Sequence, residues 1–116
     1  MDKYESIKLN KEFRYLYAKG KSFVSPSVVV YVKQNRLQHN RLGITSGKKI
    51  GKAVKRNRAR RLIRVAFRSL QDKLDAHYDM IIVARTRCVY ADSNEVTKDL
   101  KNCFIQAGIL QDEIYH

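Results

Sequence analysis

The sequence has 116 residues, 44% of them hydrophobic, and carries a formal net charge of +13. This length suits a single domain spanning residues 1–116, and the hydrophobic fraction excludes a disordered chain, which combines low hydrophobicity with high charge. Because the longest purely apolar run covers only residues 80–84 and no apolar segment follows the N-terminus, we expect no membrane span, no secretion signal and a cytoplasmic protein.

The N-terminal part predicts a helix over residues 10–18. Its apolar side chains recur at positions i, i+4, i+7 and i+8, as one face of a helix requires, and they are Leu9, Phe13, Leu16 and Tyr17. Gly20 follows at the place where a helix of this length would end.

The next part of the chain predicts strands. Residues 22–24 favour a short strand, which the sequence Ser25-Pro26-Ser27 interrupts. Residues 28–33 are β-branched and aromatic and predict a longer strand. Residues 34–40 are polar and turn-like, so we expect residues 41–45 to be the returning strand of a hairpin.

A long helix is predicted over residues 52–74. Six apolar residues follow helical spacing there without a gap and define one narrow stripe, namely Ala59, Leu62, Ile63, Ala66, Phe67 and Leu70. A buried strand is expected over residues 78–84. Asp92, with Glu95 three residues later, resembles a capping box at the start of a last helix, which Gly108 would end.

Together these elements follow the order α-β-β-(β)-α-β-α. Helices that cover one face of a mostly antiparallel sheet give an α+β fold, here a two-layer α/β sandwich. Cys88 and Cys103 show no CxxC spacing and the histidines are scattered, so we expect neither a disulfide framework nor a metal site. Cys103 falls at an apolar helical position and is expected to be a small buried hydrophobe.

Positive charge is concentrated in one part of the chain. Residues 13–71 contain sixteen Lys and Arg and no Asp or Glu, whereas the rest of the chain has eight cations and eleven acids. A domain with this distribution presents a positive surface, which attracts phosphates and releases their counterions on contact. We therefore expect a polyanion as the partner, and regard a basic surface that merely aids solubility as the weaker alternative.

The long helix has a polar side opposite its apolar stripe. Projected at about 100° per residue, that side holds Asn57, Arg60, Arg61, Arg64 and Arg68, with Arg58 on its flank. The like charges at i, i+4 mildly destabilise a helix, and no glutamate relieves them, so the helix is arranged for a ligand such as phosphate. A nuclear-localisation sequence and a membrane-surface helix are alternatives, but the apolar stripe is better explained as part of a core.

One stretch of the sequence resembles a known signature. The residues Gly43-x-Thr45-x-Gly47-Lys48-Lys49-Ile50-Gly51-x-Ala53-Val54-x-Arg56-Asn57-Arg58-x-Arg60-Arg61-x-x-Arg64 are similar to the signature of the ribonuclease P protein family, which has an Arg-Asn-Arg core on a helix. The likeness extends to Phe13-x-x-x-Tyr17-x-x-Gly20 and to Ile81-Ile82-Val83-Ala84-Arg85. It ends before residues 109–116, and the family more often has Lys where Arg60 stands.

The resemblance implies both a fold and a function. Family members have an α/β sandwich with a left-handed βαβ crossover, against the usual rule. They assist a catalytic RNA that removes the 5′ leader from precursor tRNA. The implied partners are therefore ribonuclease P RNA and the precursor tRNA, with no membrane and no small-molecule substrate. The resemblance also implies that the holoenzyme requires Mg²⁺, while the protein itself binds no cofactor or metal.

The resemblance further implies two groups of contact residues. The RNA-binding group lies on and just before the basic helix and comprises Lys48, Lys49, Lys52, Arg56, Asn57, Arg58, Arg60, Arg61, Arg64 and Arg68. The second group forms a cleft for the single-stranded leader and comprises Phe13, Tyr17, Tyr31 and Arg85. Aromatic stacking holds single strands with little sequence preference, at about 1–3 kcal/mol per base. The residues themselves leave an alternative open, in which the three aromatics are ordinary core positions and Arg85 is simply solvated.

The sequence contains no recognisable catalytic constellation. It lacks a Ser-His-Asp arrangement, an HExxH sequence, a Walker loop and carboxylates with metal-binding spacing. In-line hydrolysis of a phosphodiester needs ions that bind the attacking and leaving oxygens, and RNA would hold most of these. Three other functions are alternatives: a ribosomal protein, a DNA-binding protein with a helix exposed to the major groove, and a stand-alone ribonuclease with its own general acid and base.

Overall fold

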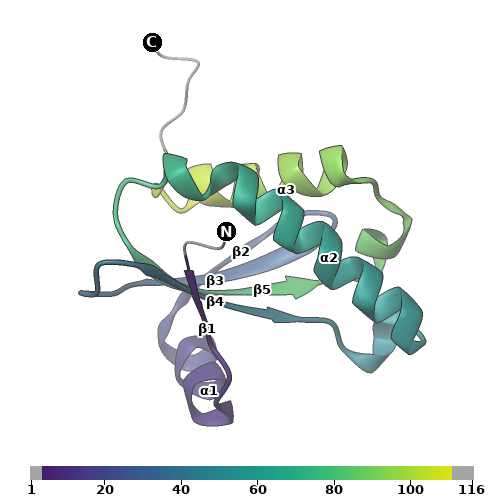
Figure 1. Cartoon of the computed structure of the whole chain (residues 1–116), viewed down its shortest axis with the longest axis horizontal. Helices are drawn as coiled ribbons and strands as arrows, with labels where there is room; N and C mark the ends of the chain where they lie inside the picture. Colours follow the sequence, from purple (N-terminus) through teal and green to yellow (C-terminus); the bar gives the residue numbers. More distant parts are fainter. Residues whose placement is uncertain (1–3, 111–116) are drawn as a thin grey trace.

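The computed structural model describes residues 4–110, in which a five-stranded sheet carries helices on both faces (Figure 1). The strands are β1 (Tyr4–Ser6), β2 (Lys21–Val24), β3 (Val28–Gln34), β4 (Asn40–Thr45) and β5 (Tyr78–Ala84). The helices are α1 (Asn10–Lys19), α2 (Ala53–Leu70) and α3 (Ser93–Gln106), with short 3-10 helices η1 (Lys48–Ile50), η2 (Gln71–Lys73) and η3 (Thr86–Tyr90). The α+β class and the order of the predicted elements are confirmed.

The strand order in the sheet is β1-β4-β5-β3-β2. β4 pairs in parallel with β1 and β5, whereas β3 pairs antiparallel with β5 and β2, so the sheet is mixed rather than mostly antiparallel. The predicted hairpin of β3 with β4 is wrong, because β5 lies between them. β5 is apolar on both faces, and its residues Met80, Ile81 and Ile82 are fully buried, so a central position removes the most apolar surface from water. β4, α2 and β5 form the βαβ unit for which the resemblance implies a left-handed crossover.

The helices do not all cover one face of the sheet, as the sequence had led us to expect. α2 and α3 pack on one face, where Val28 and Val30 of β3 meet Phe67 and Phe104. α1 lies on the other face, where Leu16 packs with Ile7 and Ile81 (Figure 1). The side chains of β3 and β5 alternate between the faces, and both faces carry apolar groups, so each face requires a cover.

The ends of the helices follow local chemistry. The buried stripe of α2 ends at Leu70, and the predicted continuation to residue 74 is instead the 3-10 turn η2. Leu62 is half-buried at the edge of the stripe, while Ala59, Ile63 and Phe67 are fully buried. At the start of α3, the Asp92 carboxylate accepts a hydrogen bond from the Glu95 N–H at 2.9 Å, as the capping box predicts.

The strand β1 was not predicted from the sequence. It has only three residues, and it pairs Tyr4 with Asn40 at the edge of β4. The Tyr4 ring packs edge-on against Phe67, with the ring centroids 5.3 Å apart, and thereby joins the N-terminal segment to α2. A three-residue edge strand is too short to show a period in the sequence.

Candidate nucleic-acid interface

α2 presents a cationic surface to solvent because its apolar stripe packs against the core on the other side. Ala59, Ile63, Ala66, Phe67 and Leu70 are buried against the sheet and α3. The residues on the solvent side belong to the predicted RNA-binding group. Exposed members of that group are Lys48, Lys49, Lys52, Asn57, Arg58, Arg61, Arg64 and Arg68, and half-buried members are Arg56 and Arg60. The amphipathic pattern therefore places the predicted group on one continuous stretch of η1 and α2.

Five arginines of the first three turns of α2 have no acidic partner in the part of the chain that the structure describes. Within residues 4–110, the side chains of Arg56, Arg58, Arg60, Arg61 and Arg64 form no ion pair with a carboxylate. Repulsion among like charges at i, i+4 costs a few tenths of a kcal/mol per pair, on the order of 0.2–0.5. An array of unpaired guanidinium groups is suited to phosphates, because each planar fork binds two oxygens of one phosphate.

Two residues of the Arg-Asn-Arg sequence are oriented by neighbouring groups. The Arg60 guanidinium donates to the Asn57 side-chain oxygen, which leaves the Asn57 amide N–H groups to donate to a ligand. Arg58 donates through Nη1 to the backbone oxygen of Ala91 at 3.4 Å, so it leans toward η3. Burial raises the pKa of the Cys88 thiol to about 11, and the positive charge of Arg58 acts in the opposite direction. Arg58 therefore lies close to the buried thiol and to the segment after η3.

A cluster of aromatic side chains lies on the opposite face of the sheet. Phe13 and Tyr17 of α1 have ring centroids 6.4 Å apart, and Tyr17 meets Tyr31 of β3 edge-on at 4.8 Å. Tyr31 faces away from Val28, Val30 and Val32 of β3, because its side chain packs with the α1 cluster whereas the valines belong to the other core. Tyr17 is 41% exposed, so the cluster is open to solvent and is more than a core contact. The structure thus brings together the three aromatics of the predicted leader cleft.

Gly43 of β4 provides the space for the Phe13 ring. A Cβ atom at this position would lie 2.7 Å from Cζ of Phe13 and 2.8 Å from Cε1, closer than such atoms approach. Any side chain there would displace the ring. The glycine in the sequence signature is therefore explained by the packing of α1 rather than by a turn.

Arg85 has a structural contact. It follows β5, and its Nη1 donates to the backbone oxygen of Ser25 at 2.8 Å. The turn containing Ser25 is also bound to α3, where the Asp99 carboxylate accepts from the Ser27 hydroxyl at 2.7 Å and from the Ser27 N–H at 3.1 Å. Arg85 is exposed beyond this contact, and its role toward a leader phosphate stays a prediction.

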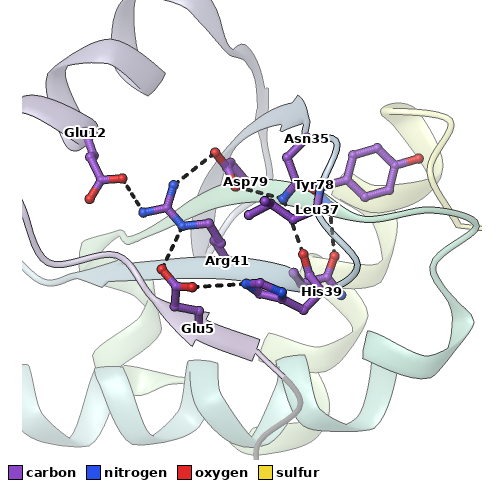
Figure 2. Close-up of polar contacts among 9 residues, drawn as sticks. Glu5, Glu12, Asn35, Leu37, His39, Arg41, Tyr78 and Asp79 are labelled. Atoms are coloured by element: carbon purple, nitrogen blue, oxygen red, sulfur yellow. Dashed lines mark hydrogen bonds and ion pairs between the residues drawn. The ribbon is translucent and has the colours of Figure 1, made fainter.

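Arg41, which the sequence grouped with the other cations of residues 13–71, is instead neutralised within the fold (Figure 2). Its Nε lies 3.1 Å from Oε2 of Glu5 and its Nη1 lies 3.5 Å from Oδ2 of Asp79, while Nη2 pairs with Glu12. These hydrogen bonds raise the pKa of Arg41, that with Glu12 contributing most. The pKa of Glu5 is lowered, chiefly by its hydrogen bond with His39. No sequence signal could have shown this, because the three acids lie far from Arg41 along the chain.

Residues 4–110 contain no helix that is long and apolar enough to cross a membrane. In the same residues, no group of three or more His, Cys, Asp or Glu side chains is placed to hold a metal ion.

Known proteins resemble this chain in both sequence and structure. A family model described as Ribonuclease P matches residues 1–108. The chain is 39% identical over 108 residues to the ribonuclease P protein component of Clostridium botulinum (strain Langeland), covering 92% of this chain and 97% of that protein. It is 42% identical over 111 residues to that of Clostridium kluyveri, covering 94% and 98%.

Solved structures show the same likeness. The RNase P protein of Staphylococcus aureus superposes with a TM-score of 0.81 at 32% identity, covering 91% of this chain and 97% of that one. The RNase P protein of Thermotoga maritima superposes with a TM-score of 0.75 at 28% identity, covering 84% and 93%. The similarity therefore extends over most of the chain rather than over the basic helix alone.

Proposed function

The chain belongs to the ribonuclease P protein family and is a protein subunit of that tRNA-processing ribonucleoprotein, and we propose that two of its surfaces bind RNA. In the proposal, α2 and η1 bind the RNA subunit, and the aromatic cluster of Phe13, Tyr17 and Tyr31 holds the 5′ leader of precursor tRNA. The protein would act in the cytoplasm, because its precursor-tRNA substrate is made there.

The absence of acidic partners for Arg58, Arg61 and Arg64 within residues 4–110 is the observation that carries the RNA-binding part of the proposal. A helix that serves only as a solvated surface usually intersperses acids with its bases, since opposite charges at i, i+4 stabilise it. α2 has no acid in its 18 residues and leaves Arg58, Arg61 and Arg64 exposed. RNA phosphates would neutralise these charges and release counterions, which favours binding at low salt.

The aromatic cluster supports the leader-binding part of the proposal. A leader is single-stranded, and its bases have free π-faces that stack on aromatic rings without regard to sequence. Tyr17 and Tyr31 come from different elements, so a base inserted beside them would contact both α1 and the sheet. Arg85, at the end of β5, would add a phosphate contact, because its side chain is exposed beyond its bond to the Ser25 oxygen.

We propose that the hydrolysis itself takes place at Mg²⁺ ions held by RNA. The groups that α2 offers to a ligand are guanidinium, ammonium and amide groups, none of which accepts a proton at neutral pH. His39, in the turn before β4, is hydrogen-bonded to Glu5 at the opposite end of the sheet's strands from η1. The chain would then contribute by positioning the leader and by lowering repulsion between the two RNAs.

The ribosomal alternative receives no support from the comparisons, since the family and the superposed structures are ribonuclease P proteins. The DNA-binding and stand-alone ribonuclease alternatives are equally unsupported.

The test is cleavage of precursor tRNA by a bacterial ribonuclease P RNA at low Mg²⁺ concentration, with and without this protein. We expect the protein alone to be inactive and the RNA to regain accurate 5′ cleavage when the protein is added. The double variant Arg58→Ala with Arg61→Ala should weaken this rescue at least tenfold. Arg36→Ala, which removes an exposed arginine in the turn after β3, is the matched control and should rescue normally. An RNA that is indifferent to the wild-type protein would refute the proposal.

A further inference from the structure

Tyr90 is an exposed aromatic side chain next to the basic helix. It is the last residue of η3, and 69% of its surface is exposed, more than for any of the aromatics of the leader cluster. Within residues 4–110 its ring packs against no other aromatic ring, and its hydroxyl has no hydrogen-bond partner. An isolated exposed tyrosine is ordinary, so its surroundings decide whether it has a function.

The backbone on both sides of Tyr90 is fixed. Cys88 is fully buried, its N–H donates to the Arg85 oxygen at 2.9 Å, and its Sγ lies 3.9 Å from the Ala59 oxygen of α2. Ala91 is 2% exposed, and its N–H donates to the Cys88 oxygen at 3.4 Å. Tyr90 therefore projects from a segment anchored to α2 on both sides, and little conformational freedom is lost when a ligand covers its ring.

Positive charge lies near the segment that carries Tyr90. The Arg58 guanidinium donates to the backbone oxygen of Ala91, the residue next to Tyr90, at 3.4 Å. Val54 lies one helical turn before Arg58 on the same side of α2 and is 80% exposed. η1, with Lys48 and Lys49, packs against η3. The elements that carry an exposed aromatic residue, an exposed aliphatic residue and several cations thus pack together at the N-terminal end of α2.

The nearby acids do not cancel this charge. Asp92 caps α3, where its carboxylate accepts from the Glu95 N–H at 2.9 Å. The Glu95 carboxylate lies 3.4 Å from Nη2 of Arg87. Both acids are therefore engaged on α3, whereas the guanidinium of Arg58 has only a backbone oxygen as a partner in the described chain.

We propose that Tyr90 is a base-stacking residue, on which an unpaired nucleobase of the RNA subunit packs while Arg58 holds the adjoining phosphate. This inference rests on the proposed function and extends its RNA surface from α2 and η1 to η3. Stacking on a ring beside a guanidinium suits an unpaired base and a phosphate at the same time. The RNA subunit is the source, because Tyr90 adjoins α2, whereas the leader cluster lies under α1 on the opposite face of the sheet (Figure 1).

The absence of tryptophan from the sequence gives a direct test. Tyr90→Trp places a single tryptophan at the proposed site, and stacking on a base quenches indole fluorescence. We expect saturating ribonuclease P RNA to quench this fluorescence by at least half. Leu37→Trp is the matched control, because Leu37 is 44% exposed in the turn after β3, at the opposite end of β5 from η3. Its fluorescence should change little.

The affinity of Tyr90 variants for the RNA subunit distinguishes stacking on an aromatic ring from contact with any apolar side chain of similar volume. Tyr90→Phe keeps the ring and should bind within twofold of the wild type, whereas Tyr90→Leu keeps apolar volume and should bind about 5- to 100-fold more weakly, as expected for the loss of one stacked base. Circular dichroism of each variant confirms that it is folded. If the Tyr90→Leu variant binds normally and the Tyr90→Trp fluorescence is unquenched, while the wild type restores cleavage, Tyr90 stacking is refuted and the proposed function stands.

Two further outcomes are decisive. Quenching that occurs only after precursor tRNA is added to the protein–RNA complex would assign Tyr90 to the substrate and overturn the choice of the RNA subunit. A wild-type protein that neither binds the RNA nor restores cleavage would refute the proposed function, and with it the role of Tyr90.

Discussion

The two faces of the sheet use arginine in opposite ways. On the α1 face, the Arg41 side chain is only 17% exposed and contacts the carboxylates of Glu5, Glu12 and Asp79 (Figure 2). On the α2 face, Arg61 and Arg64 are exposed and have no acidic partner within residues 4–110. A cation in a basic sequence therefore becomes a binding group only if the fold leaves its charge unpaired.

The physical reason lies in the cost of leaving a charge alone. A half-buried carboxylate without a cation is unfavourable, so Glu12 and Asp79 depend on Arg41, whereas Glu5 is exposed and also bonds His39. An exposed guanidinium on α2 is solvated by water and can await a ligand at little cost. Substitution of Arg41 on the α1 face should therefore affect folding, and substitution of the exposed arginines of α2 should affect RNA binding.

The largest effect on folding is expected for Arg41→Met, which keeps much of the side-chain volume and removes the charge. The half-buried carboxylates of Glu12 and Asp79 would then lose their cation, so we expect the free energy of unfolding to fall by about 2–3 kcal/mol. Urea denaturation measures this. Arg36→Met, at an exposed turn, should stay within about 0.5 kcal/mol of the wild type. Equal stabilities of the two variants would show that the ion pairs of Arg41 do not stabilise the fold.

A smaller loss is expected for Gly43→Ala on the same face. The new methyl group would meet the Phe13 ring, so α1 must shift, at a cost of about 1–2 kcal/mol. The aromatic cluster would be distorted, and the holoenzyme should lose part of its preference for precursor over mature tRNA. Gly47→Ala is the control, because a Cβ there would meet no described atom within 4 Å. If the Gly43→Ala holoenzyme keeps its full preference for precursor over mature tRNA, the aromatic cluster does not bind the leader.

Cys88, the buried thiol near Arg58, makes the stability of the protein depend on pH. The pKa of Cys88 is raised by burial to about 11 from an ordinary 9.0, so Cys88 is neutral near pH 7 and cannot pair with Arg58. Because the unfolded chain releases this proton first, Cys88 causes stability to fall between about pH 9 and pH 11. Thermal melts across this range should decline less steeply for Cys88→Ala, although its melting temperature at pH 7 should be lower. Parallel declines would contradict a neutral buried thiol.

The smallest effect on folding is expected for the double variant Arg61→Ala with Arg64→Ala. Both side chains are exposed on α2, and their removal relieves repulsion, so the free energy of unfolding should change by less than about 0.5 kcal/mol or rise slightly. Urea denaturation in parallel with Arg41→Met provides the contrast. A loss as large as that of Arg41→Met would show that the α2 arginines have a structural role.

The sequence predicted most elements because their periods are strong and local. The helical stripe from Ala59 to Leu70, the valines of β3 and the cap at Asp92 each require only neighbouring residues. The place of β5 between β3 and β4 depends on pairing between distant segments, and β1 is too short to show a period. The aromatic cluster came from a family resemblance, since spacing alone could not show that Tyr31 meets α1.

The charged groups also divide into those that a local pattern predicts and those that depend on contacts between distant segments. The cationic side of α2 followed directly from its stripe, because one helix contains the whole pattern. The acids that neutralise Arg41 come from β1, α1 and β5, and only the folded chain brings them together. Tyr90 was overlooked because a single aromatic residue after a strand has no distinguishing pattern; its meaning comes from Arg58 beside it.

The salt dependence of the affinity for ribonuclease P RNA tests the contrast between the two faces most directly. The slope of log affinity against log salt counts the phosphates that the protein neutralises. We predict that Arg61→Ala with Arg64→Ala lowers this slope by about 2, and that Arg41→Met, measured where it is folded, leaves the slope unchanged. A slope that falls for Arg41→Met, or stays constant for the α2 variant, would contradict the account.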